Sequence, residues 1–220
     1  MMNKTILSSP ITLKLLPVLF WGACWGIAEA SIGYALHWAA IALPGLPGFL
    51  MFPVAFFFMY KAIQTTGQPS SALGAALVSA AIKLLDLALP GNIPLRVLNP
   101  ALSILMEGLV VLLVSRYLLR KGCTWKIWHV FIASFGWRLL FLGNLAIILQ
   151  FGLPAALITD GILVTLRYLL LESLVNSLVI LALQKVPAVN AVPAPASVLR
   201  TKPVLTFALL LVAVALQLAL

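Results

Sequence analysis

Charged residues are scarce in this chain. Only 9% of its 220 residues are Asp, Glu, Lys or Arg, whereas 63% are hydrophobic. Soluble domains are about half apolar and about a quarter charged, so the composition excludes an ordinary soluble protein and predicts an integral membrane protein. Apolar runs of about 17 residues or more recur along the chain, which is the pattern of membrane-spanning helices and not of a β-barrel.

Acidic residues are scarcer still, with five against fourteen Lys and Arg. The resulting net charge of +9 is not a nucleic-acid signal, because most of the basic residues fall in short loops between apolar runs, where they set the orientation in the membrane. With the N-terminus in the cytoplasm, only Arg96 falls in an outer loop. The asymmetry predicts a multi-pass protein of the cell membrane with a cytoplasmic N-terminus.

Catalytic and metal-binding motifs are also absent. The sequence has no HExxH, GxSxG, C-x-x-C or Walker A lysine loop, so zincin, hydrolase, thiol-redox and ATPase readings lack support. Cys24 and Cys123 fall at different depths and predict neither a disulfide framework nor a metal cluster. His37 and His129 fall at opposite membrane faces. We therefore expect no metal site, no cofactor and no enzymatic activity, and an ATP-driven role would need partner subunits.

What the sequence does contain is a series of apolar helices. We expect an all-α integral membrane protein, a compact six-helix transmembrane bundle plus a C-terminal seventh helix. A cytoplasmic tail (1–14) precedes the membrane core (15–185), and a Pro/Ala-rich linker (186–203) leads to the last transmembrane helix (204–220). Turns rich in Gly and Pro divide the core into helices at about 15–42, 49–64, 71–89, 100–119, 127–150 and 160–185.

Two features concern the ends of the expected helices: the position of Pro100 and a possible cleavage site in the first helix. Pro100 is expected in the first turn of its helix, where a missing N–H costs nothing. The residues A-E-A-S at 28–31 resemble a signal-peptidase site. The apolar run continues past them to a full span, so we expect the first helix to be retained.

Seven ionisable residues lie inside the expected spans: Glu29, Lys83, Asp86, Glu107, Arg138, Arg167 and Glu172. At about 2.5–3.5 kcal/mol each on insertion scales, exposing all of them to lipid would cost about 20 kcal/mol. That exceeds the net stability of a protein, about 5–15 kcal/mol, so they must face the bundle interior and pair. Their depths predict a polar volume that runs from the membrane centre towards the outside, as in an outward-opening binding cavity.

The alternative is that these charges only fix helix packing. Lys83 and Asp86 are three residues apart and could neutralise each other on one helix. Arg167 and Glu172 are five residues apart, a poorer match within a helix, and are expected to find partners elsewhere.

We assign substrate binding to six of the charges, with Trp25 and His37 as adjuncts: Glu29, Lys83, Asp86, Glu107, Arg138 and Arg167. Trp25, one turn from Glu29, either stacks on a planar ligand or packs in the core. A small-residue ridge on the same helix, Gly22, Gly26 and Ala30, allows close approach of another helix. That helix belongs either to this chain or to a second protein.

The segments GIAEASIGYALHW, AAIKLLDLALPG and NPALSILMEG, within the six-helix pattern of residues 15–185, resemble the substrate-binding (S) components of energy-coupling-factor (ECF) transporters. The resemblance implies both core termini in the cytoplasm and a ligand cavity towards the outside. It also implies docking through the first helix, with Gly22, Gly26 and Ala30 on the docking ridge, onto a membrane coupling subunit served by separate ATPases. The chain lacks the His-rich N-terminus of nickel and cobalt S components, which argues against those metals. The seventh helix departs from the family pattern and is expected to be a dispensable appendage.

The expected function is therefore uptake of a small polar or zwitterionic nutrient, such as a vitamin, by a substrate-binding subunit in the lipid bilayer, energised by partner ATPases. Three alternatives remain open. One is a stand-alone secondary transporter in which the acids relay protons or sodium. Another is an intramembrane enzyme acting on a lipid, although paired acidic motifs for pyrophosphate-bound magnesium are missing. The last is an assembly factor in which the charges only pair.

Overall fold

The computed structural model describes residues 12–33, 35–36, 46–186 and 203–219. Within these ranges the chain is helical throughout apart from short turns, which confirms the expected all-α membrane bundle. Six helices are long and apolar enough to cross a membrane: Leu15–Gly33, Leu46–Thr66, Ser70–Ala88, Pro94–Lys121, Ile127–Gln150 and Ile162–Lys185.

Three of these spans change helix type along their length. The first span is α1 (Thr12–Ala28) followed by a π-helical turn, η1 (Glu29–Gly33). The second is α3 (Leu46–Thr66), and the third is α4 (Ser70–Leu84) ending in a 3₁₀ turn, η2 (Leu85–Ala88). α5 (Pro94–Lys121) and α6 (Ile127–Gln150) follow. The last span combines α8 (Ile162–Leu166), a second π-helical turn η3 (Arg167–Leu171) and α9 (Glu172–Lys185), and a short helix, α7 (Ala156–Thr159), precedes it.

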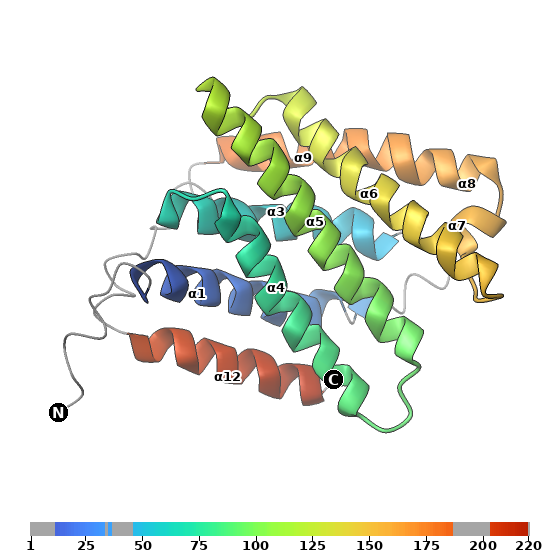
Figure 1. The fold of residues 1–220 in the computed structure, drawn as a ribbon, viewed down its shortest axis with the longest axis horizontal. Helices are drawn as coiled ribbons and strands as arrows, with labels where there is room; N and C mark the ends of the chain where they lie inside the picture. The colour runs from blue at the N-terminus through green and yellow to red at the C-terminus, as the bar shows by residue number, and fades with distance from the viewer. Residues whose placement is uncertain (1–11, 34, 37–45, 187–202, 220) are drawn as a thin grey trace.

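The six spans form a closed ring. α1, α4, α5, α6 and α9 are neighbours in that order, and α3 closes the ring by packing on α9, α1 and α4. Figure 1 shows α4 and α5 running side by side across the middle of the bundle, with α6 and α9 on one side and α1 on the other. Side chains that point inward from all six spans therefore share one interior.

Small residues on α4 let its two neighbours approach closely. Ala75 and Val78 face Gly22 of α1, and a Cβ at Gly22 would lie 2.6 Å from Val78 Cβ. On the other side of α4, Ala76 lies directly against Gly108 of α5. Contacts between such residues are how membrane helices associate, because lipid provides no hydrophobic drive between them. α4 is thus the central packing element of this half of the ring.

The C-terminal helix, α12 (Pro203–Ala219), packs along α1 on the outside of the ring and also contacts η2 (Figure 1). Its inward face, which includes Thr206, Ala213 and Gln217, is buried. Gln217 donates a hydrogen bond to Asp86 of η2. The C-terminal helix therefore buries a surface against the core and bonds one of its charges, while its being dispensable stays a prediction.

Most expected helix boundaries agree with the structure to within a few residues, but α5 starts a turn and a half earlier than expected. Pro94 occupies the first turn of α5, and Pro100 lies inside the helix. Both prolines fit a first turn equally well by sequence, and the earlier start brings Val97 into the core. Residues 34 and 37–42 of the expected 15–42 helix and most of the expected 186–203 linker lie outside the described residues.

Candidate functional site

Arg138 of α6 is the centre of the polar interior and is completely buried. Three aromatic rings surround its guanidinium carbon, which lies 4.6 Å from the ring centroid of Trp137, 5.3 Å from that of Tyr168 and 6.0 Å from that of Phe52. These rings come from α6, η3 and α3. Cation–π attraction of this kind is worth about 2 kcal/mol or more when the cation is desolvated, which offsets part of the cost of burying the charge.

The guanidinium is only partly hydrogen-bonded within the chain. Nη1 donates to the hydroxyl and the carbonyl oxygen of Ser134, at 2.6 and 3.2 Å. Nη2 lies 3.8 Å from a carboxylate oxygen of Glu172, an ion pair without a hydrogen bond. Neither Nε nor Nη2 of Arg138 donates a hydrogen bond to any described residue. Two nitrogen atoms of this fully buried guanidinium are therefore able to donate hydrogen bonds to a ligand or to water.

Glu172 joins Arg138 to a second base. Its other carboxylate oxygen lies 3.5 Å from Nε of Arg167. These two residues are five apart, and the π-helical turn η3 between them places positions i and i+5 on one face. The expectation that Arg167 and Glu172 are poorly matched within one helix is therefore wrong, because it assumed α-helical spacing.

Glu107 of α5 brings a second acid to the same interior. Its side chain is buried, and Oε2 accepts no hydrogen bond from the described residues. Glu107 interacts electrostatically with Arg138 and also with Glu29 of η1. Glu29 is half-buried, and it in turn interacts with Lys83 of α4. Five spans thus contribute ionisable side chains that are buried or half-buried, as the cost of exposing them to lipid predicted.

The buried face of α9 is polar. Glu172, Ser173, Asn176 and Ser177 recur at helical spacing on that face and are all buried. Ser173 Oγ and Asn176 Nδ2 make no hydrogen bond to the described residues. Because buried polar groups in native proteins nearly always have a partner, this face is suited to a polar guest or to water.

At the other end of the network, Lys83 and Asp86 are satisfied within the chain. Lys83 Nζ lies 2.8 Å from Asp86 Oδ2, the pairing that the three-residue spacing allows. Asp86 Oδ1 accepts a 2.7 Å hydrogen bond from Gln217 Nε2, and the backbone carbonyl of Asp86 accepts one from Asn92. This pair fits the alternative that the charges only fix helix packing better than it fits a role in ligand binding.

Helix irregularities coincide with the intramembrane charges. One π-helical turn begins at Glu29 and the other begins at Arg167 and ends next to Glu172, while Asp86 lies in the 3₁₀ turn. Single π turns within α-helices are often found at functional sites. Hydrophobic periodicity does not predict such turns. They are the clearest structural sign that Glu29, Asp86 and Arg167 differ from ordinary packing residues.

The remaining predicted residues have simpler surroundings. Trp25 is fully buried, and its indole N–H donates to Glu29 Oε1 at 3.1 Å, so it packs in the core. Gly22 and Gly26 face Val78 and Ile82 of α4, so the close approach that they allow is made by a helix of this chain. Ala30 is buried as well. His37 lies outside the described residues.

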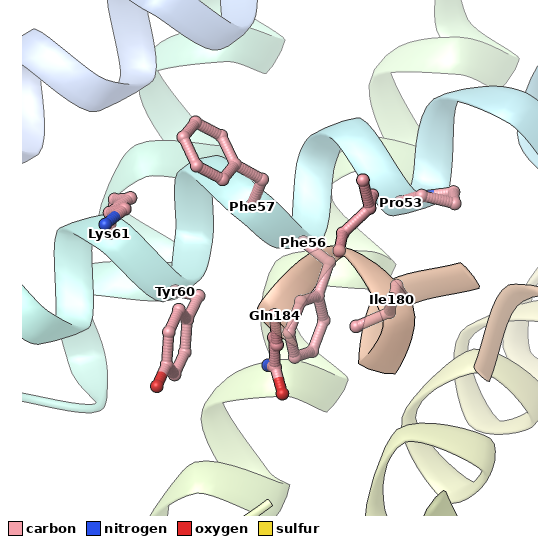
Figure 2. Close-up of a pocket in the computed structure, with 8 residues that line it drawn as sticks. Pro53, Phe56, Phe57, Tyr60, Lys61, Ile180 and Gln184 are labelled. Carbon is pink, nitrogen blue, oxygen red and sulfur yellow. The ribbon is translucent and has the colours of Figure 1, made fainter. Parts of the chain in front are cut away.

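Among the described residues, the two best-defined surface hollows include none of the interior charges. The first lies between α3 and α9, where the ring of Phe56 lies beside Ile180 and Gln184 (Figure 2), and at about 20 Å³ it has room for one water molecule. The second, about 410 Å³, is open and lies at the membrane-boundary end of α4 and α5. A ligand of Arg138 would therefore need the helices to separate.

Sequence reasoning missed the partners of the central arginine. Phe52 and Tyr168 come from distant spans and carry no signal in the sequence. Ser134 could have been found, because it precedes Arg138 by four residues, the spacing at which side chains on a helix meet. Gln217 was missed because the last helix looked featureless.

Comparison with protein-family models, with curated proteins and with solved structures finds no match for this chain.

Proposed function

We propose that this protein is a membrane substrate-binding component that takes up a small polar or zwitterionic nutrient. One observation carries the proposal: a base and an acid of neighbouring helices, Arg138 of α6 and Glu107 of α5, are both buried, and both keep hydrogen-bonding atoms without a partner among the described residues. A zwitterion would supply an acceptor for the guanidinium and a donor for the carboxylate. Intramembrane charges usually mark a substrate or ion pathway.

The polar face of α9 supports the same role. Ser173 and Asn176 lie in the first two turns of α9, which packs on the helix of Arg138, and both are buried with polar atoms that have no partner among the described residues. Side chains of this kind fix the orientation of a ligand, whereas the surrounding aromatic rings shape its apolar part. The ligand would enter as α3, α6 and α9 separate.

The resemblance to S components of ECF transporters adds partners to the proposal. A membrane coupling subunit and ATPase subunits would energise uptake at the cell membrane. Because α4 covers Gly22 and Gly26, such a coupling subunit would have to contact other residues of α1 or displace α4.

The test is mass spectrometry of protein purified gently from the membranes in which it was made. The wild-type protein is expected to retain a small polar compound, and Glu107→Gln is expected to lose it while remaining folded, because the amide has the same volume and removes a buried charge. Asp160→Asn, which changes an exposed acid, is the control and is expected to retain the compound. A wild-type protein that carries no small molecule and brings down no ATPase or coupling subunit would contradict the proposal.

A stand-alone ion-coupled transporter is the second candidate, favoured by two acids within the spans, half-buried Glu29 and buried Glu107. Intramembrane carboxyl groups of this kind often belong to proton or ion pathways. Reconstitution into liposomes separates the candidates. Accumulation of the retained compound driven by a proton or sodium gradient alone favours the second candidate, and a requirement for added ATPase partners favours the first.

A further inference from the structure

The hollow at the end of α4 and α5 combines positive charge with apolar surface. It is an open surface hollow of about 410 Å³, lined by Gly67, Gln68, Pro69, Ser70, Arg116, Leu119 and Arg120. Arg116 and Arg120 lie four residues apart on α5, so their side chains leave the same face of the helix. Both are exposed.

No carboxylate side chain neutralises these arginines. The chain has five acids in all. Two of them, Asp86 and Glu172, form ion pairs among the described residues, and their partners are Lys83, Arg138 and Arg167. Neither Arg116 nor Arg120 forms an ion pair or a hydrogen bond through its side chain within the described part of the chain. Two guanidinium groups, each able to hold a phosphate by paired hydrogen bonds, thus border a hollow that contains no negative group.

The opposite wall adds to the positive potential. α4 begins at Ser70, and its first turn has no acidic residue and no side-chain cap. The backbone N–H groups of Ser71 and Ala72 donate to the carbonyl oxygens of Gln68 and Pro69, but no negative side chain offsets the positive end of the α4 dipole here. Gly67, with a φ of +70°, turns the chain from α3 into this wall.

The apolar part of the hollow distinguishes a lipid from a free anion. Leu119 stands between the two arginines in sequence and is 66% exposed. The hollow lies where α3 ends, α4 begins and α5 ends, at the boundary between the apolar spans and water. A phospholipid placed there has its phosphate at the arginines and its acyl chains along the exposed apolar surface of α5, where Leu113 is 54% exposed. A free phosphate would leave both leucines without a contact.

We infer that this hollow binds the phosphate of an anionic phospholipid, such as phosphatidylglycerol, as a specific site at one membrane face. Basic pockets between membrane helices bind anionic headgroups by this combination of charge and apolar wall. The inference is independent of the transport proposal, because it uses none of the interior charges.

Native mass spectrometry in a neutral detergent tests the site by titration with phosphatidylglycerol or phosphatidylcholine. The wild-type protein is expected to bind the first in preference to the second. Each basic residue near an anionic group contributes about fivefold in affinity, so Arg116→Gln/Arg120→Gln is expected to weaken phosphatidylglycerol binding about thirtyfold. Lys121→Gln/Lys126→Gln removes the same charge at the same end of the molecule without touching the hollow, and is expected to change the affinity by less than about threefold.

Three results would overturn the inference. Equal binding of the two lipids by the wild-type protein would mean that there is no anionic-lipid site. An equal loss in the two double variants would mean attraction to a general basic surface only. If millimolar inorganic phosphate displaces phosphatidylglycerol and raises the thermal unfolding temperature only when both arginines are present, the ligand is a free phosphate and the lipid assignment is wrong.

Discussion

At the residue scale, the protein's interior depends on Arg138. Its charge is tolerable in the core because three aromatic faces, one serine and one carboxylate surround it. Buried ion pairs contribute little net stability when complete, but removing one partner leaves the other charge uncompensated. The arginine is therefore where a single substitution should have the largest effect.

We predict that Arg138→Gln destabilises the protein by about 3–5 kcal/mol, because Glu172 and Glu107 then lack a nearby fully buried cation. Thermal unfolding in detergent, followed by tryptophan fluorescence, should show a fall of about 6–20 °C. Arg138→Gln combined with Glu172→Gln should recover part of that loss, because the pair is then removed as a unit. A double variant that is less stable than the sum of its single variants would contradict this interpretation.

The interior charges show what could and what could not be predicted from the sequence. The seven interior charges could be predicted because exposing any of them to lipid is expensive. The pair of Lys83 and Asp86 could be expected from its spacing, but the pairing of Arg167 with Glu172 could not, since it depends on a π-helical turn. That turn is a local backbone choice without a known sequence signature, and it reversed the expectation based on α-helical spacing.

At the element scale, α4 determines how closely the first half of the ring packs. A Cβ at Gly22 would lie 2.6 Å from Val78 Cβ and 2.9 Å from the backbone oxygen of Ala75. We predict that Gly22→Ala destabilises the protein by about 1–3 kcal/mol, the usual cost of overpacking. Gly143→Ala in α6 is the matched control, because nothing lies within 4 Å of the added methyl group.

The two glycine variants should differ in sign. Alanine is about 1 kcal/mol more favourable than glycine in a helix interior, so Gly143→Ala should raise the thermal unfolding temperature while Gly22→Ala lowers it. If Gly22→Ala is as stable as the wild type, the α1–α4 contact is looser than the structure describes. Periodicity and small-residue spacing predicted a close contact of α1, whereas only the fold identifies α4 as its partner.

The C-terminal helix is a second element whose role the sequence left open. We predict that Gln217→Leu lowers the free energy of unfolding by about 1.5–3 kcal/mol, because the buried carboxylate of Asp86 then loses the hydrogen bond that Gln217 donates to it. A double-mutant cycle with Asp86→Asn, read by chemical or thermal unfolding, should assign most of this loss to the pair. Leu211→Ala, at a side chain that is 71% exposed, should leave stability within about 0.5 kcal/mol of the wild type. An equal effect of Leu211→Ala would mean that α12 contributes only general apolar contact.

At the scale of the whole molecule, composition predicted an integral membrane protein, and the order of apolar runs and turns predicted the six spans and most of their ends. These depend on hydropathy and on turn residues, both of which act locally. The closed ring was not predictable, because it depends on α3 packing against α9, two elements more than a hundred residues apart. The order of helices around the ring decides which charges meet, and so the site could be predicted as a list of residues but not as a network.

The distribution of basic residues makes one further prediction, about orientation. The turns at 67–69 and 122–126 lie at one end of the bundle and the turn at 151–155 lies at the other. Lys and Arg concentrate at the first end, which the positive-inside rule places in the cytoplasm.

The native Cys123 is exposed at that end, and Leu153 is 43% exposed at the other. In a Cys24→Ser variant, a membrane-impermeant maleimide should label Cys123 only after the cells are permeabilised. In a Cys24→Ser/Cys123→Ser/Leu153→Cys variant it should label intact cells. The reverse pattern would show the opposite orientation and would move the anionic-lipid hollow to the outer face, while leaving its chemistry unchanged.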